Sequence, residues 1–134
     1  KNIGQSRIHG IELLSHINIG GWDTKINLSF IDPVDTSTGE VLNNRSRESV
    51  RLDFDRTLSN YSLGATIKYQ GVRYTSSETL DSYTLVDLRA NYALNKNWSL
   101  KGKITNAFNE EYTVKADYNT PGKSMFISIH YLGL

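Results

Sequence analysis

Strict alternation of apolar and polar side chains from Trp98 to Thr105 is the feature that most constrains how this chain can fold. Successive side chains of a strand point to opposite sides of a sheet, so this segment predicts a strand with two unlike faces. One face carries an apolar set: Trp98, Leu100, Gly102 and Ile104. The other face includes Lys101 and Lys103, and lysine is almost never buried without a partner. The apolar face therefore needs a cover, and the charged face needs water or counter-charges.

Six more segments show a similar period of two, and no segment shows the apolar spacing of a helix. The alternation predicts seven strands, over residues 7–17, 22–31, 47–58, 61–70, 83–94, 98–105 and 124–131. The predicted fold is all-β, an antiparallel up-and-down meander of about seven strands in one domain that spans residues 1–134.

The connections between these strands alternate in length. Short connections are predicted at residues 18–21, 59–60 and 95–97, and long polar ones at 32–46, 71–82 and 109–123. One end of the sheet then carries tight turns and the other carries large loops. Bacterial outer-membrane barrels have this asymmetry, with short periplasmic turns and longer extracellular loops.

Composition agrees with a membrane barrel and argues against other classes. The chain is 38% hydrophobic, without the run of about 18 apolar residues that a membrane helix requires. A barrel wall needs apolar residues only at alternate positions. The net charge of +1 does not suggest a nucleic-acid partner, and the absence of cysteine excludes disulfides and thiolate metal sites.

Side chains of a kind gather on each predicted face. Aromatic residues on the apolar face group near the two ends of the strands, as in the girdles of a membrane barrel: Trp22, Tyr61, Tyr92, Trp98 and Tyr131 at the short-turn end, and Phe30, Tyr69 and Phe108 at the other. The aliphatic set predicted to face lipid is Leu28, Leu52, Leu63, Ile67, Leu88, Leu100 and Ile127. The opposite face collects charge: Lys25, Arg51, Asp53, Asp55, Lys68, Asp87, Arg89, Lys101 and Lys103. On this polar face we expect Asp87 and Arg89 to face Lys101 and Lys103 across neighbouring strands, and we expect Thr66 to tolerate an arginine.

Three stretches resemble landmarks of the TonB-dependent outer-membrane receptors. Residues 7–12, R-I-H-G-I-E, resemble the R-I-x-G-[VIL]-E strand of that family. Residues 106–112, N-A-F-N-E-E-Y, are similar to its N-[LA]-F-[DN]-x-x-Y signature, and residues 118–123, Y-N-T-P-G-K, match the Y-x-x-[PA]-G-[RK] that precedes its last strand. The resemblance covers essentially the whole chain and is strongest to the vitamin B12 (cobalamin) transporter branch.

The resemblance implies a 22-stranded barrel in the bacterial outer membrane, with outer-membrane lipid around it. It implies a plug domain inside the barrel and energy supplied through TonB. Residues 1–134 would be the C-terminal portion of that barrel, with the plug and the TonB box outside this segment. The transported ligand would be cobalamin or a ferric siderophore. The family usually ends on an aromatic residue, whereas this chain ends Tyr131-Leu132-Gly133-Leu134.

Two other architectures share the one-sided pattern. One is a small complete outer-membrane barrel with a structural or adhesive role, although residues 1–6 are short for an eighth strand. The other is a soluble β-sandwich that acts as a binding module. Seven strands taken alone would leave two unpaired edges and an uncovered apolar face, so we expect the isolated chain to self-associate.

No enzyme, cofactor or metal site is predicted. His9, His16 and His130 are scattered, and Ser128 and His130 share a face without a carboxylate to orient the histidine. Asp32, Asp35 and Glu40 lie in one loop but lack the spacing of a calcium-binding loop. The 106–112 stretch is expected to end a strand and close a loop rather than bind a ligand.

Overall fold

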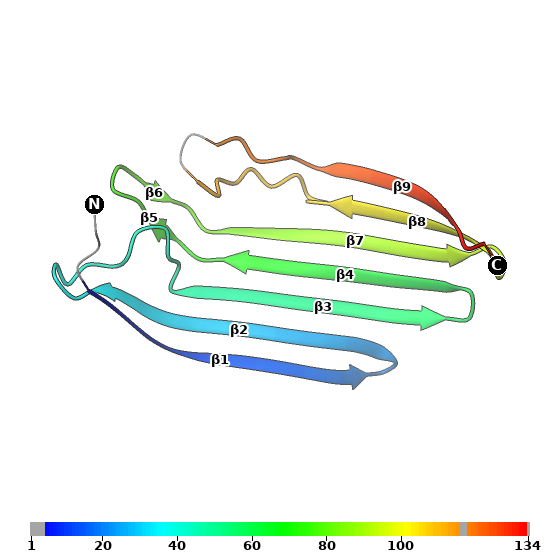
Figure 1. Ribbon diagram of the computed structural model, residues 1–134, viewed down its shortest axis with the longest axis horizontal. Coiled ribbons are helices and arrows are strands. Elements are labelled where there is room, and N and C mark those ends of the chain that lie inside the picture. The colour runs from blue at the N-terminus through cyan, green and yellow to red at the C-terminus, as the bar shows by residue number, and fades with distance from the viewer. Residues whose placement is uncertain (1–4, 116–117, 134) are drawn as a thin grey trace.

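The chain forms one curved antiparallel sheet in the computed structural model, which describes residues 5–115 and 118–133 (Figure 1). Its seven main strands are β1 (Ser6–Ile19), β2 (Trp22–Asp35), β3 (Glu48–Leu58), β4 (Tyr61–Gln70), β7 (Tyr83–Ala93), β8 (Trp98–Thr105) and β9 (Ser124–Tyr131). They follow one another in the order β1-β2-β3-β4-β7-β8-β9, so the predicted meander is confirmed. No helix capable of crossing a membrane occurs among the described residues.

The ends of the sheet differ as predicted. Tight turns join β1 to β2, β3 to β4 and β7 to β8 at one end, and long connections lie at the other (Figure 1). Gly20 and Gly21 have φ values of 59° and 84°, a backbone conformation that glycine adopts without steric cost. Some expectations concern positions outside the described residues: the segment before Gln5 weighed as an eighth strand, part of the loop at 109–123, and the terminal Leu134.

Two long connections are more ordered than expected. β2 continues to Asp35, through a proline that was expected to lie in the loop. Beyond Phe30 this strand keeps its ladder with β1, and on its other side the described residues give it no strand partner but a single bridge, from Val34 to Val41 in the loop. Proline is tolerated in a strand where its nitrogen has no ladder partner. The connection at residues 71–82 contains a small hairpin, β5 (Arg73–Tyr74) and β6 (Thr79–Leu80).

The strand register brings the predicted apolar residues to one face. Leu28 lies opposite Leu13 on β1 and Val50 on β3. Ile67 on β4 lies opposite Leu52 on β3 and opposite Val86 on β7. The predicted aliphatic set therefore shares one face of the sheet, and the predicted charged set shares the opposite face.

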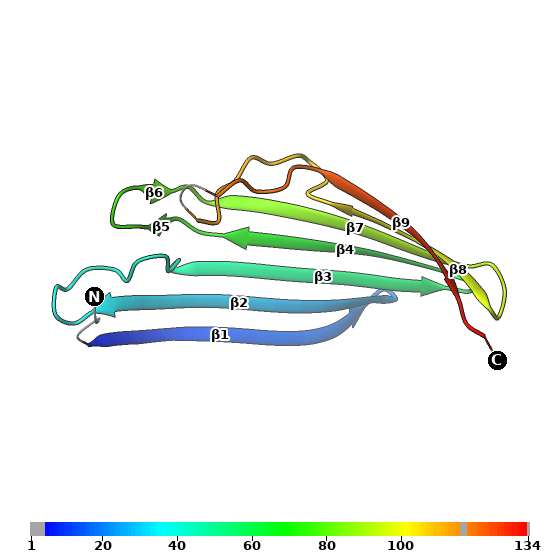
Figure 2. The same cartoon turned by 45° about the horizontal axis from the view of Figure 1, so that its top comes forward.

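The sheet is a single layer (Figure 2). Of the described residues, Leu80 is the one large aliphatic side chain that is deeply buried, at 3% exposure. On β9, Met125, Ile127 and Ile129 are each about two-thirds exposed (65%, 69% and 66%). A β-sandwich would cover this face with a second sheet, so that alternative is wrong.

Candidate functional site

The polar face holds an ion pair that crosses an entire strand. Asp55 on β3, Gly64 on β4 and Arg89 on β7 lie side by side in one row of the sheet. Arg89 Nε donates to Asp55 Oδ1 at 2.9 Å, and its Nη2 donates to Asp55 Oδ2 at 2.7 Å. This two-bond geometry is the strongest arrangement between an arginine and a carboxylate. The pair thus connects two strands that are not neighbours.

Gly64 makes that crossing possible. A Cβ at this position would lie 2.5 Å from Asp55 Oδ1 and 2.8 Å from Arg89 Cζ, distances that real Cβ atoms do not show. The guanidinium of Arg89 and the carboxylate of Asp55 therefore meet directly above the backbone of β4, in the space that a side chain at position 64 would occupy. The sequence showed a glycine on the polar face but gave no sign of this role, since it depends on register across three strands.

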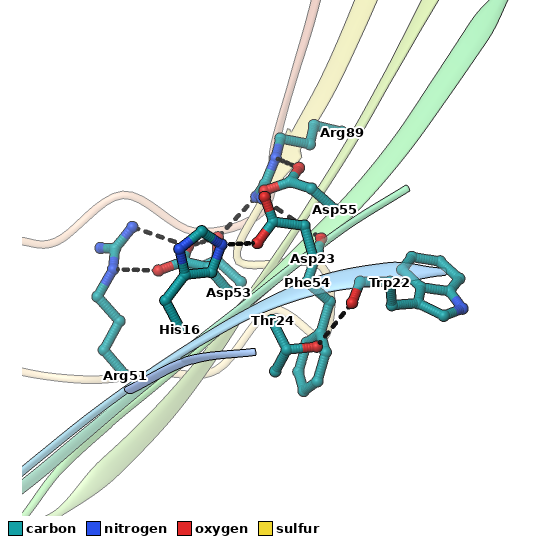
Figure 3. A network of polar contacts seen from close by, with 10 residues as sticks. His16, Trp22, Asp23, Thr24, Arg51, Asp53, Phe54, Asp55 and Arg89 are labelled. Carbon is teal, nitrogen blue, oxygen red and sulfur yellow. Dashed lines mark hydrogen bonds and ion pairs between the residues drawn. The ribbon is translucent and has the colours of Figure 1, made fainter. Parts of the chain in front are cut away.

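The ion pair is part of a longer network (Figure 3). Arg51 donates to both carboxylate oxygens of Asp53, at 2.7 and 2.9 Å. Thr66, on the strand between, donates its hydroxyl to Asp53 at 2.6 Å and accepts from Arg89 Nη1 at 2.7 Å. Thr66 is only 4% exposed, so the expectation that it would tolerate an arginine is wrong: the larger side chain would displace the centre of the network.

The predicted pairing between β7 and β8 is corrected by the register. Arg89 lies directly opposite Lys103, a like charge, and Lys101 lies opposite Asn91. Asp87 instead forms an ion pair with Lys68 on β4, at 3.0 Å. Alternation assigns each residue to a face but does not fix which residues of adjacent strands are opposite, so the partners could not be read from the sequence.

A hollow of about 380 Å³ lies on the polar face beside this network. Asp55, Arg89, Lys101, Lys103 and Phe126 are among the residues that line it. Among the described residues, neither lysine has a carboxylate within ion-pair distance, whereas Arg89 is satisfied by Asp55. The hollow therefore offers two lysine charges that form no ion pair with the described residues, next to a neutralised pair.

The N-A-F-N stretch after β8 holds a loop in place, as predicted. Asn106 is 4% exposed, has a φ of 49°, and donates its backbone N–H to Asp87 Oδ1 at 3.1 Å. Its side-chain amide exchanges two hydrogen bonds with the backbone of Glu110, at 2.9 and 2.8 Å. Asn109, with a φ of 57°, accepts a bond from the Lys123 backbone N–H at 2.8 Å just before β9.

A second cluster, which sequence reasoning missed, joins two loops at the same end. Arg73 in the small hairpin is 6% exposed and donates to the backbone oxygens of Val114 at 2.6 Å and Thr113 at 2.5 Å. Its guanidinium also lies 5.5 Å from the ring of Tyr83, which packs against Tyr112 with centroids 4.7 Å apart. Nothing local in the sequence distinguishes this arginine from a solvated loop residue.

Four of the residues weighed for other chemistry, His16, Asp32, Ser128 and His130, have ordinary side-chain partners. His16 pairs with Asp23, and Asp32 pairs with Arg47 at 3.1 Å. Ser128 lies 3.1 Å from His130, on an exposed part of β9. Within residues 5–115 and 118–133, no group of three or more His, Cys, Asp or Glu side chains is placed to hold a metal ion.

Comparison with known proteins places this geometry in a family. The model of the TonB dependent receptor-like β-barrel matches residues 1–107. Two curated relatives are vitamin B12 transporters BtuB: that of Photobacterium profundum is 29% identical over 133 residues, covering 97% of this chain and 22% of the relative. That of Vibrio vulnificus is 28% identical over 136 residues, with the same coverage of 97% and 22%. The chain spans about a fifth of the length of these relatives.

Solved structures show the same fold. The ferripyoverdine-binding FpvA of P. aeruginosa superposes with a TM-score of 0.82 at 16% identity, over 94% of this chain and 19% of that one. The ferric enterobactin receptor PfeA of Pseudomonas aeruginosa gives a TM-score of 0.77 at 23% identity, over 97% of this chain and 23% of that one. With its strand order, one apolar face and one charged face, the chain belongs to the TonB-dependent receptor β-barrel family, which resides in the outer membrane of Gram-negative bacteria.

Proposed function

We propose that the complete protein is a TonB-dependent transporter that imports cobalamin, and that this segment supplies about a third of a 22-stranded barrel wall. The observation that carries the proposal is the match to two vitamin B12 transporters along 97% of the chain. The two solved receptors described above bear names of iron-chelate receptors, but at 16% and 23% identity they support the fold alone.

The polar face would line the lumen, because the apolar face of an outer-membrane barrel lies against lipid. There the network around Arg89 would stiffen the wall from within, since it joins β3 to β7 across β4. Lys101 and Lys103 would remain free to meet acidic groups of a plug domain, whose position in the lumen is part of this proposal. Their charges are exposed beside the hollow and have no described partner of their own.

The loop end would face the outside of the cell, where a large ligand first arrives. Arg73 and Asn106 each hold long-loop backbone in place through hydrogen bonds, so these loops would present a shaped rather than a fluctuating surface. Transport would proceed without catalysis by this segment. The Ser128–His130 contact has no described carboxylate to orient the histidine as a base.

The test is uptake by the full-length protein. Its gene is expressed in a Gram-negative host that lacks its own cobalamin receptor, and entry of radiolabelled cyanocobalamin is followed in parallel with that of a ferric siderophore. We expect saturable cobalamin entry that disappears when the host lacks TonB. Siderophore entry alone would replace cobalamin with an iron chelate as the substrate. Absence of both, from a receptor shown to be folded in the outer membrane, would favour the structural or adhesive alternative.

A further inference from the structure

One cation interrupts the apolar face at the short-turn end. Arg56 lies opposite Leu63 on β4, and alternation puts its side chain on the same face as Phe54 and Leu52. Among the described residues, it is the single cationic residue on this face of β2, β3, β4, β7, β8 and β9. A charge on a lipid-facing surface is costly at the centre of the membrane and tolerated near its boundary.

The residues around Arg56 are those expected at the boundary of the membrane. Its Cζ lies 5.8 Å from the ring centroid of Trp22, a residue of the aromatic group at this end of the strands. Asp23, the residue after Trp22, lies opposite Asp55 in the register, so Trp22 lies on the face opposite to the Arg89–Asp55 pair. No carboxylate of the described residues lies within ion-pair distance of Arg56. Its charge is therefore available to bind an external anion.

An apolar hollow of about 510 Å³ is lined by Trp22, whose ring Arg56 contacts, and by Leu63, which lies opposite Arg56. Its outward-facing lining includes Trp22, Leu63, Ala65, Ala90, Gly102 and Ile127. Leu63, Ala90, Gly102 and Ile127 form one row that continues from Arg56 across β4, β7, β8 and β9. The hollow exists because small residues occupy the middle of that row, and a Cβ added at Gly102 would meet no atom within 4 Å.

We propose that Arg56 and this hollow form a binding site for one phospholipid of the membrane leaflet at the short-turn end. The lipid phosphate would accept charge-assisted hydrogen bonds from the Arg56 guanidinium, beside the indole of Trp22. One acyl chain would lie along the hollow and cover the small residues of the row. The occupant is a phospholipid because the family resides in the outer membrane, where this face meets lipid, and because the site combines a cationic end with an apolar channel.

The phosphate half of the site is tested by lipid titration of the full-length receptor in mild detergent, read by native mass spectrometry. Arg56→Gln should weaken the retention of phosphatidylglycerol by about five-fold, the loss expected when the hydrogen bonds from the guanidinium to the phosphate are removed. Lys96→Gln is the matched control, because Lys96 is an exposed cation of the turn at the same end. Diacylglycerol, which lacks the phosphate, should be retained equally by the wild type and Arg56→Gln.

The acyl half is tested by filling the hollow. Gly102→Leu should lower the retention of both lipids, whereas Ser15→Leu, a comparable increase in size on the apolar face of β1, should not. Circular dichroism of each variant verifies that the barrel is folded. The proposal fails if Arg56→Gln and Lys96→Gln retain phosphatidylglycerol alike, or if Gly102→Leu behaves as Ser15→Leu does. Neither readout depends on transport, so the site and the proposed function fail separately.

Discussion

Because Arg89 crosses Gly64 to reach Asp55, we expect Gly64→Ala and Gly102→Ala to change the free energy of unfolding in opposite directions. Gly64→Ala places a methyl group 2.5 Å from Asp55 Oδ1 and 2.8 Å from Arg89 Cζ, so the ion pair must separate. Gly102→Ala, two strands away in sheet order, places the same methyl group in open space. Both replacements remove a glycine from the interior of a strand, which by itself stabilises the fold.

The size of each expected change in unfolding free energy depends on how exposed the ion pair is to solvent. The side chains of Arg89 and Asp55 are 35% and 46% exposed, so solvent weakens the pair and its two hydrogen bonds contribute about 2 kcal/mol in total. Replacing glycine by alanine returns about 0.5–1 kcal/mol by restricting the unfolded chain. Gly64→Ala should therefore lower the free energy of unfolding by about 1–1.5 kcal/mol. Gly102→Ala should raise it by about 0.5–1 kcal/mol.

The measurement is reversible urea unfolding of the full-length receptor in lipid vesicles, followed by tryptophan fluorescence. The Arg89→Ala variant tests whether the ion pair is the cause of the destabilisation. Because this variant already lacks the pair, adding Gly64→Ala should no longer destabilise the barrel. The two single changes and the double change form a cycle whose coupling energy should be about 2 kcal/mol, the contribution of the pair. Equal effects of Gly64→Ala and Gly102→Ala, or a destabilisation by Gly64→Ala that persists without Arg89, would refute the crossing.

Changes elsewhere in the sheet and its loops have equally definite expected outcomes. Ile67→Arg should lower the unfolding free energy of the receptor in vesicles by about 2–4 kcal/mol, and Ser128→Arg on the polar face by much less; equal losses would contradict the assignment of faces. Arg73→Met should expose the loop around Thr113 and Val114 to protease, because the backbone oxygens of these two residues lose their donor; unchanged cleavage would count against this role. Asn106→Ala should cost about 2 kcal/mol through its positive φ and two lost hydrogen bonds, measured as above against Ser128→Ala. The isolated 134-residue chain should scatter light as an oligomer in detergent-free buffer; a dispersed folded monomer would contradict this.

What the sequence could predict is what alternation encodes locally. Each strand reveals its own two faces, because its neighbours in sequence are also its neighbours along the strand. Leu52 and Ile67, which are far apart in the chain, could thus be assigned to one surface without any knowledge of pairing. The turn at Gly20 and Gly21 was equally local, since it depends on the backbone freedom of two adjacent residues.

The contacts that the sequence could not predict depend on the register between strands and on side chains that contact distant segments of the chain. Charge pairing was expected between β7 and β8, but the register sets Arg89 opposite Lys103, a like charge, and the carboxylate that pairs with Arg89 comes from a strand two positions away. The sequence does not distinguish Thr66 from any other small polar residue, yet Thr66 bridges Asp53 and Arg89. Arg73 gave no signal at all, because its partners are backbone oxygens about 40 residues away in the chain. Such contacts arise only once three or more segments have been placed.

The register also separates two kinds of charge on the polar face, and this separation has a consequence for the lumen. Arg51, Asp53, Asp55 and Arg89 satisfy one another within the wall, so a group that approached them would have to displace existing bonds. Lys101 and Lys103 have no such bonds to lose among the described residues. A negatively charged surface inside the barrel gains more by meeting the lysines than by opening the network. Contact between the wall and whatever fills the lumen should therefore depend on the two lysines, while the stiffness of the wall depends on the network beside them.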